Sequence, residues 1–245
     1  MSTTWSLQFL QDGDHSGHDR ALIVLNQPLN LPLLSQLWPA SGWRCFADGG
    51  ANRVHDIFPE PGTRNMYLPD LIKGDLDSIR PDVRAYYSAL GIPIVHDPDQ
   101  YSTDLMKCVA AAMDVNPPPQ EIVLLGGLSG RLDQTIHTLS FLHKMRAEDV
   151  RIYAVTPDNV GWVLDGGEHT IDLSGLHGVG PTCGLLPVGI DSTVLTTRGL
   201  RWNLDEKESS FDGMVSTSNQ LDANEVYVKT SRPIWWCVEL GDKWK

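Results

Sequence analysis

The sequence predicts two domains: an N-terminal Rossmann-like three-layer α/β/α domain with a mostly parallel sheet, and a C-terminal all-β sandwich. Between residues 20 and 156, short apolar runs alternate with segments of helical period. After about residue 165, short alternating or β-branched segments are separated by glycine, proline and asparagine, without a clear helical pattern. We therefore expect the domains to span residues 1–165 and 166–245.

Most of the expected strands of the first domain are too short for helices and too uniformly apolar to lie on a surface. They are residues 21–26, 43–48, 71–75, 92–97, 121–127 and 151–155. Two longer segments have helical period, and we expect their apolar faces to cover the sheet. These faces are Leu105, Met106, Val109 and Met113 in one segment, and Leu132, Ile136, Leu139 and Leu142 in the other.

The second domain has five candidate strand segments with alternating or β-branched residues. They are residues 168–173, 192–204, 213–219, 225–230 and 234–240. We expect the first 20 residues and residues 58–70 to be variable loops.

Composition excludes several classes of partner. The 245 residues carry a formal net charge of −12 and contain no cluster of Lys and Arg, so a nucleic-acid backbone would be repelled. No stretch approaches the ~20 apolar residues of a membrane span. The four cysteines are scattered, without metal-binding spacing, which favours a reducing compartment. We expect a soluble, cytoplasmic protein.

Polar residues follow the predicted strands repeatedly, at the edge of the sheet where their carboxyl ends meet. They include Asn26, Asp48, the pair Asp75 and Asp77, and the glycine-rich residues 125–134. Open α/β sheets bind ligands outside this edge, because loops and helix N-termini converge there. The sequence therefore predicts a ligand site at the carboxyl edge.

Asp75 and Asp77 are two residues apart, so in an extended segment both carboxylates project to the same side. Like charges this close repel, and a hard divalent cation with oxygen ligands would relieve the repulsion. Asp104 follows Thr103, a good N-cap, at the start of a predicted helix. We interpret the three acids as ligands of Mg²⁺ that bridges the protein to a nucleotide polyphosphate. The alternative is a turn in which Asp77 or Ser78 caps the next helix.

Two glycine-containing loops could approach a nucleotide. In residues 47–52, Gly49 lets the backbone come close to a ligand, and Asp48 or Asn52 could hydrogen-bond a ribose or base. A simple strand-to-helix turn is the alternative. In residues 125–134, Arg131 could bind phosphate and Asp133 a polar group.

The sequence contains neither the Walker motif G-x-x-x-x-G-K-[ST] nor the dinucleotide-binding motif G-x-G-x-x-G. Lys73 and Lys107 are the basic residues nearest the loops at the carboxyl edge, and Lys107 is the candidate for binding the nucleotide. The alternative for both is a solvated side chain without a ligand.

The second domain offers a flat aromatic face at Trp202, and hydroxyl and amide groups at Ser216, Ser218 and Asn219. Such a combination suits a small heteroaromatic substrate. The alternative is a strand with a buried tryptophan, followed by a polar hairpin.

Seven blocks of sequence, spread over about residues 20–240, together resemble the thiamine pyrophosphokinase family. They are "ADGGANRVHD", "IKGDLDSIRPDVRAYY", "DPDQYSTDLMKC", "LGGLSGRLDQTIHTL", "CGLLPVG", "GLRWNL" and "VSTSN". The resemblance implies a nucleotide-binding domain, a β-sandwich that binds thiamine, and a homodimer with composite active sites. It also implies transfer of the pyrophosphoryl group of Mg-ATP to the thiamine hydroxyl, with release of AMP.

The resemblance also implies roles for individual residues. Asp75, Asp77 and Asp104 match the magnesium-binding and catalytic acids, whereas Asp48 and Asn52 fall in the nucleotide loop. The remaining implied contacts are Gln100, Arg131 and Asp133 for substrate or phosphate, and Trp202, Ser216, Ser218 and Asn219 for thiamine. One departure is Met106, where many relatives would have a threonine. Two other functions stay open: a non-catalytic nucleotide or thiamine sensor, and another Mg-dependent phosphoryl transferase.

Overall fold

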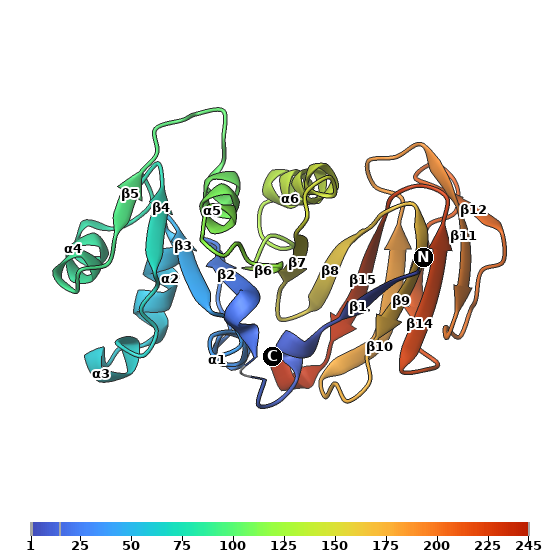
Figure 1. Ribbon diagram of the computed structural model, residues 1–245, viewed down its shortest axis with the longest axis horizontal. Helices are drawn as coiled ribbons and strands as arrows, with labels where there is room; N and C mark the ends of the chain where they lie inside the picture. Colours follow the sequence, from blue (N-terminus) through green and yellow to red (C-terminus); the bar gives the residue numbers. More distant parts are fainter. Residues whose placement is uncertain (1, 15, 245) are drawn as a thin grey trace. The chain divides into compact units, whose positions relative to one another are not determined.

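The computed structural model describes residues 2–14 and 16–244, which form a mixed α/β protein with two sheets (Figure 1). The chain divides into two compact units. The parallel-sheet unit comprises Asp14–Thr135 and Asp149–Thr156. The β-rich unit comprises Met1–Gly13, Ile136–Glu148 and Pro157–Lys245.

Six parallel strands form the sheet of the parallel-sheet unit, in the spatial order β5-β4-β3-β2-β6-β7. They are β2 (Arg20–Val24), β3 (Trp43–Ala47), β4 (Leu71–Gly74), β5 (Ile94–His96), β6 (Glu121–Leu125) and β7 (Arg151–Val155). All six lie within or almost within the predicted stretches. Every residue of β2 is buried, as expected for an apolar strand at the centre of a covered sheet.

Helices and short turns connect these strands. The connecting helices include α1 (Leu31–Leu37), α2 (Gly50–Ile57), α3 (Pro61–Arg64), α4 (Pro81–Ala89) and α5 (Asp104–Met113), and the 3₁₀ turn η2 (Gly17–Asp19) precedes β2. Helix α5 packs against β2, β3 and β4, and α2 packs against β3 (Figure 1). Leu105 and Val109 of α5 are buried as predicted, whereas Met106 and Met113 are only half-buried. The predicted loop at 58–70 contains the short helix α3.

The β-rich unit contains a five-stranded sheet and four further hydrogen-bonded strands. The first has the order β1 (Ser2–Ser6), β9 (Gly167–Asp172), β14 (Glu225–Thr230), β11 (Ser192–Arg198) and β12 (Lys207–Ser210). The four others, in order, are β13 (Ser216–Gln220), β10 (Val179–Leu186), β15 (Ile234–Leu240) and β8 (Asn159–Leu164). Two short 3₁₀ helices, η1 (Gln8–Leu10) and η3 (Asp242–Trp244), also belong to this unit.

The compact units are not two consecutive stretches of chain. Met1–Gly13 groups with Pro157–Lys245 because β1 pairs in parallel with β9, so the expectation of a loop at the N-terminus was wrong for Ser2–Ser6. The sequence signal there is weak, since β1 is largely exposed and polar. The assignment of residues 1–165 and 166–245 to different substrates is a separate matter and stays a prediction.

Helix α6 (Leu132–Met145) buries only part of the face that was predicted: Leu142 is buried as expected, but two other members of that face are exposed. Its buried residues are Thr138, Phe141 and Leu142, whereas Leu132 is 74% exposed and Ile136 is 50% exposed. The helical period was correct, but α6 carries apolar residues on more than one face, so the period alone did not determine which face is covered.

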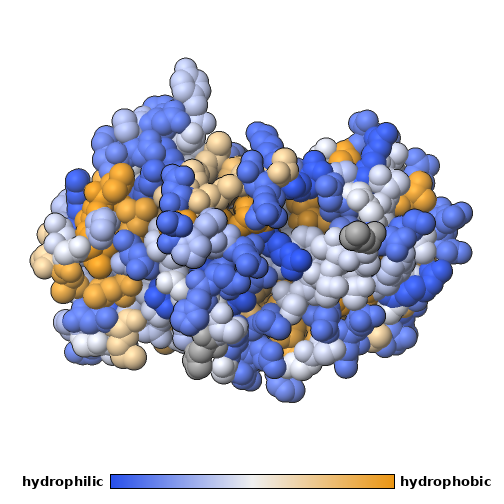
Figure 2. All heavy atoms as spheres, in the orientation of Figure 1, coloured by the Kyte–Doolittle hydropathy of each residue, from blue (hydrophilic) through white to orange (hydrophobic). Residues whose placement is uncertain are grey.

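On the face drawn in Figure 2, hydrophilic residues predominate, in keeping with a chain in which 20% of residues are charged. Among the described residues, no helix combines the length and the apolar composition needed to cross a membrane.

Candidate active site

Three acids meet at the carboxyl edge of the parallel sheet. Asp48 follows β3, Asp75 follows the neighbouring strand β4, and Asp104 begins α5, and one carboxylate oxygen from each lies within 4.8 Å of the others. A Cβ on Gly74 would lie 2.7 Å from Cβ of Asp48 and 2.8 Å from Oδ1 of Asp104. Glycine at this position therefore lets the acids approach one another. We call Asp48, Asp75 and Asp104 the acid cluster.

Asp48 is the most buried member of the acid cluster, with 1% of its surface exposed. Its φ of 41° is in the left-handed region, which is uncommon for a residue other than glycine. Its carboxylate accepts hydrogen bonds from the backbone N–H groups of Ser78 at 2.9 Å and Ile79 at 3.0 Å. Burial nevertheless raises the pKa of Asp48, and the charge of Asp75 adds to the increase.

Asp104 is the first residue of α5, and Thr103 is its N-cap, accepting a hydrogen bond from the N–H of Met106 as predicted. The carboxylate of Asp104 accepts a hydrogen bond of 3.1 Å from the N–H of Asp75. Burial raises the pKa of Asp104, and the charges of Asp75 and Asp48 raise it further. Two acids of the cluster thus hold a proton more tightly than an ordinary aspartate.

Asp77 does not join the acid cluster among the described residues. The prediction assumed an extended segment, but Leu76 has a φ of 59°, so the chain turns between the two aspartates. Asp77 is exposed and accepts a 2.8 Å hydrogen bond from the hydroxyl of Ser78. The alternative of a helix cap is also wrong, because Arg80 is the N-cap residue of α4 and no side chain caps it.

Lys107 lies beside Asp104 of the acid cluster, with 4% of its surface exposed. Its Nζ donates a hydrogen bond of 2.8 Å to the carbonyl of Asp97 and lies 3.8 Å from Oδ1 of Asp104. The alternative of a solvated side chain is therefore wrong for Lys107. Gln100, in contrast, is exposed, and its Nε2 donates to the carbonyl of Pro98.

Asn52, on α2, uses both ends of its amide to hold the backbone that follows the acid cluster. Its Nδ2 donates to the carbonyl of Ser78 at 2.8 Å, and its Oδ1 accepts from the N–H of Arg80 at 3.0 Å. Gly49, the N-cap residue of α2, allows close approach, since a Cβ there would lie 2.3 Å from Nδ2 of Asn26. Asp48 and Asn52 together fix residues 78–80.

The glycine-rich loop 126–130 leads to Arg131 and Asp133, which are both exposed and form a 2.5 Å ion pair. Gly126, Gly127 and Gly130 have φ values of 116°, 91° and 82°, which only glycine adopts readily. The sequence analysis did not identify the residue that anchors this loop, Gln27. The available signal was its position directly after Asn26, at the carboxyl end of β2.

In the β-rich unit, Asn219 holds the turn that carries Trp202. Asn219 is 4% exposed; its Oδ1 accepts from the N–H of Trp202 at 3.2 Å and its Nδ2 donates to the Trp202 carbonyl at 2.9 Å. The Trp202 ring is 53% exposed, so the alternative of a core tryptophan is wrong. The Arg201 guanidinium lies 4.9 Å from the ring centroid and covers part of one face.

Ser216 and Ser218 lie on β13 but differ in burial, since Ser216 is buried and Ser218 is exposed. Ser218 has a φ of 54° and lines a cavity of about 300 Å³, together with Asp158, Thr182 and Glu239 among others. Two carboxylates beside a hydroxyl give this cavity an acidic, polar wall.

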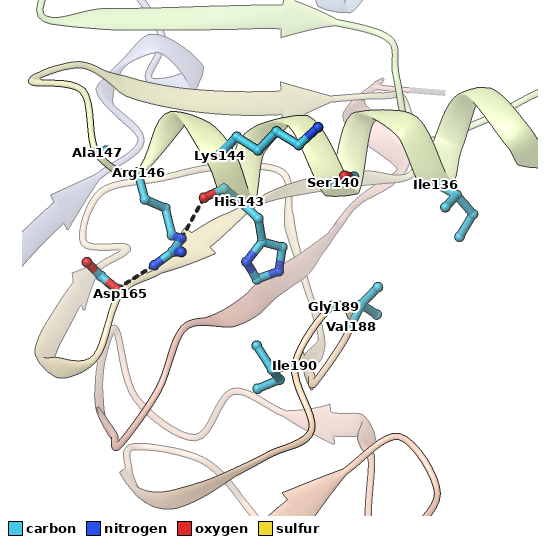
Figure 3. A pocket seen from close by; sticks show the side chains of 10 residues that line it. All are labelled: Ile136, Ser140, His143, Lys144, Arg146, Ala147, Asp165, Val188, Gly189 and Ile190. Carbon is cyan, nitrogen blue, oxygen red and sulfur yellow. Dashed lines mark hydrogen bonds and ion pairs between the residues drawn. The ribbon is translucent and has the colours of Figure 1, made fainter.

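A second pocket of the β-rich unit, of about 650 Å³, lies between α6 and residues 188–190 (Figure 3). Figure 3 shows His143 pointing toward Ile190, and Arg146 reaching Asp165, with which it forms a 2.7 Å ion pair. Burial lowers the pKa of His143. None of the predicted site residues lines this pocket.

An acid cluster at the carboxyl edge of a parallel sheet, beside glycine-containing loops, is typical of proteins that bind nucleotides. The chain belongs to the thiamine pyrophosphokinase family. Residues 34–154 match the family model "Thiamin pyrophosphokinase, catalytic domain", and residues 168–235 match "Thiamin pyrophosphokinase, vitamin B1 binding domain".

Individual relatives agree with the family models. The chain is 40% identical to thiamine pyrophosphokinase 1 of Oryza sativa subsp. japonica, over 90% of this chain and 87% of the relative. It is 29% identical to thiamine pyrophosphokinase of Saccharomyces cerevisiae, over 89% and 85% of the two chains. The crystal structure of yeast thiamin pyrophosphokinase aligns with a TM-score of 0.86 at 27% identity, covering 97% of this chain and 91% of that one.

The structure of thiamin pyrophosphokinase from Candida albicans gives a similar result, with a TM-score of 0.85 at 25% identity over 98% and 93% of the two chains. The predicted family resemblance is confirmed, and with it the predicted enzyme class, a transferase with thiamine pyrophosphokinase function.

Proposed function

We propose that this protein transfers the pyrophosphoryl group of Mg-ATP to the hydroxyl of thiamine, giving thiamine diphosphate and AMP. The observation that carries the proposal is the acid cluster at the carboxyl edge, in a chain of this family. Transfer of a pyrophosphoryl group depends on positioning and charge neutralisation more than on covalent chemistry with the protein.

The acid cluster suits Mg²⁺ by the chemistry of its donors. Magnesium prefers oxygen ligands and binds through one or two carboxylates together with substrate phosphates. Burial and mutual repulsion raise the pKa values of Asp48 and Asp104, and a divalent cation would relieve both costs. When bound, the ion would neutralise charge on the phosphates. Asp48, Asp75 and Asp104 are the proposed ligands, and Asp77, which the sequence suggested, would act at most from outside this group.

Some other residues would contact the substrates directly, and others would keep site residues in place. Arg131 is the proposed phosphate contact, and Gln100 and Asp133 are proposed substrate contacts. The ammonium group of Lys107 lies close enough to Asp104 to keep that carboxylate oriented. Asp48 and Asn52 fix the backbone that follows Asp77 and Asp75, so this segment would need little reorganisation when the nucleotide binds.

We propose that residues 1–165, as a Rossmann-like three-layer domain, bind the nucleotide, and that residues 166–245, as a β-sandwich, bind thiamine. The parallel sheet and its helices support the first assignment, and the match to the vitamin B1 binding domain model supports the second. On the thiamine side, the exposed ring of Trp202 would stack on the substrate. Ser216, Ser218 and Asn219 complete this proposed surface.

We also propose a homodimer with composite active sites, because phosphate-binding and thiamine-binding residues lie in different compact units. A cytoplasmic location is supported by four cysteines that form no disulfide.

The decisive experiment is an assay of the purified protein with Mg-ATP and thiamine, with both nucleotide products quantified. We expect AMP and thiamine diphosphate in equal amounts. Production of ADP with thiamine monophosphate would indicate a different phosphoryl transferase. Binding of both ligands without turnover would indicate a sensor.

A further inference from the structure

Gln27 is a buried polar residue just beyond the carboxyl end of β2, with 7% of its surface exposed. Its Oε1 accepts hydrogen bonds from the N–H of Gly127 at 2.9 Å and from the hydroxyl of Ser129 at 3.0 Å. Its Nε2 donates to the carbonyl of Ser129 at 2.8 Å. One side chain thus makes three hydrogen bonds to the glycine-rich loop 126–130.

Gln27 lies at the edge of the sheet where the spatial order of the strands reverses. From β2, the chain adds β3, β4 and β5 on one side and then returns to place β6 on the other side of β2. The loops after β2 and β6 therefore flank the point where the order of strands reverses, which is where open α/β sheets bind ligands. Gln27 connects these two loops directly.

Gln27 holds a loop whose backbone is intrinsically flexible. Glycine residues at positive φ give it wide conformational freedom in the absence of anchoring contacts. The Gln27 side chain contacts the loop at Gly127 and at Ser129, and the N–H of Gly126 donates to the carbonyl of Val155 at 2.8 Å. The loop ends one residue before Arg131, so its conformation sets where the guanidinium is presented.

We infer that Gln27 is a positioning residue for nucleotide turnover: it holds the glycine-rich loop so that Arg131 meets the phosphates of the bound nucleotide. This inference rests on the proposed function. A displacement of about 1 Å at a catalytic group can cost about 10²-fold in rate, so loss of three anchoring bonds should be visible in the kinetics. A merely structural role would instead lower stability and leave the nucleotide parameters unchanged.

The test compares Gln27→Met, which keeps the length and volume of the side chain and removes its hydrogen bonds, with Ser41→Ala. Ser41 is a matched control because it is 2% exposed, lies in the same unit, and donates one hydrogen bond to the Leu37 carbonyl, away from the loop. For each protein, kcat and KM are measured for ATP and for thiamine, alongside Tm. Hydrogen exchange of residues 126–131 is also followed.

We expect Gln27→Met to lower kcat/KM for ATP by about 10- to 100-fold, with KM for thiamine changed less than about 2-fold. Amide exchange at Gly127 should become faster, whereas Ser41→Ala should change Tm alone. Wild-type kcat/KM for ATP in Gln27→Met would overturn the inference, and so would a loss of kcat/KM for ATP of the same size in Ser41→Ala.

Failure of the proposed function has a different signature. If the wild-type protein makes no thiamine diphosphate, the same variants are compared by calorimetric titration with Mg-ATP. Weaker binding by Gln27→Met than by Ser41→Ala would then support the inference, and equal binding would overturn it.

Discussion

Two regions of the molecule hold backbone in place with a buried side chain, but they do so with different chemistry. In the parallel-sheet unit, Asp48 holds residues 78–79 and is itself a charged member of the acid cluster. In the β-rich unit, the neutral amide of Asn219 holds the turn of Trp202. The first region gathers negative charges whose burial and repulsion cost free energy. The second presents the aromatic face of Trp202, and the Asn219 amide is already hydrogen-bonded. Substitutions should therefore affect turnover in the first region and substrate affinity in the second.

The largest effect is expected for Asp75→Asn and Asp104→Asn. Each removes a charge from the proposed metal site while keeping the size of the side chain, so kcat should fall by about 10²-fold or more. Circular dichroism and Tm should show a folded protein, because the edge of the sheet is not its core. Near-normal Mg-dependent kcat in both variants would remove the acid cluster from the active site.

Mixing variants tests whether the two regions cooperate across chains. Assayed at a thiamine concentration far below the raised KM of Asn219→Ala, Asp104→Asn and Asn219→Ala should each be nearly inactive alone. If subunits exchange randomly in a symmetric dimer with composite sites, the mixture should recover about a quarter of wild-type activity. Exchange can be verified by native mass spectrometry of differently tagged chains. Verified exchange without any recovery would mean that each site lies within one chain.

Substitutions of Asp48 and Asp77 test whether the metal ligands are those that the structure brings together or those that the sequence pattern suggested. Asp48→Asn should lower kcat at least about 10-fold more than Asp77→Asn, because only Asp48 lies within reach of Asp75 and Asp104. The loss of a hydrogen-bond acceptor at position 48 is monitored by Tm at saturating ATP. The opposite ranking would restore the pair Asp75 and Asp77 as the metal ligands.

Trp202→Ala should raise KM for thiamine several-fold and change KM for ATP little, because an aromatic face stacked on a partly cationic heterocycle contributes ~0.5–2 kcal/mol. Trp202→Phe should recover much of the loss. The ring is already half exposed, so Tm should fall only slightly in both variants. A large decrease in Tm with equal losses for both substrates would instead indicate a packing role.

The smallest effect concerns pH. Because the folded-state pKa values of Asp48 and Asp104 are raised, their protonation stabilises the fold at low pH, and this contribution is lost as pH rises through those values. Mg²⁺ competes with these protons, so it should raise Tm by about 2–5 °C near pH 7.5 and by less near pH 5. Scanning calorimetry during titration with Mg²⁺, in buffer without Ca²⁺, measures the shift in Tm at each pH. In Asp104→Asn the pH dependence of this shift should be weaker.

The sequence was informative where one physical signal dominates. Uniformly apolar runs predicted all six parallel strands, and the Thr103 cap correctly predicted where α5 begins. The two-residue spacing of Asp75 and Asp77 implies a common side only for an extended chain, and the left-handed φ of Leu76 cannot be read from that spacing. Metal binding by Asp77 stays a prediction. The anchors Gln27 and Asn52 have partners about 100 and about 26 residues away, and such pairings cannot be read from local spacing.

The parallel pairing of β1 with β9 has a consequence for protein synthesis. Ser2–Ser6 leave the ribosome more than 150 residues before their partners Glu168–Asp172. Strand β1 therefore cannot pair with β9 while the parallel-sheet unit is being synthesised, although that unit can already fold. Substitutions in Ser2–Ser6 would thus act on a late stage of folding and leave the parallel sheet intact.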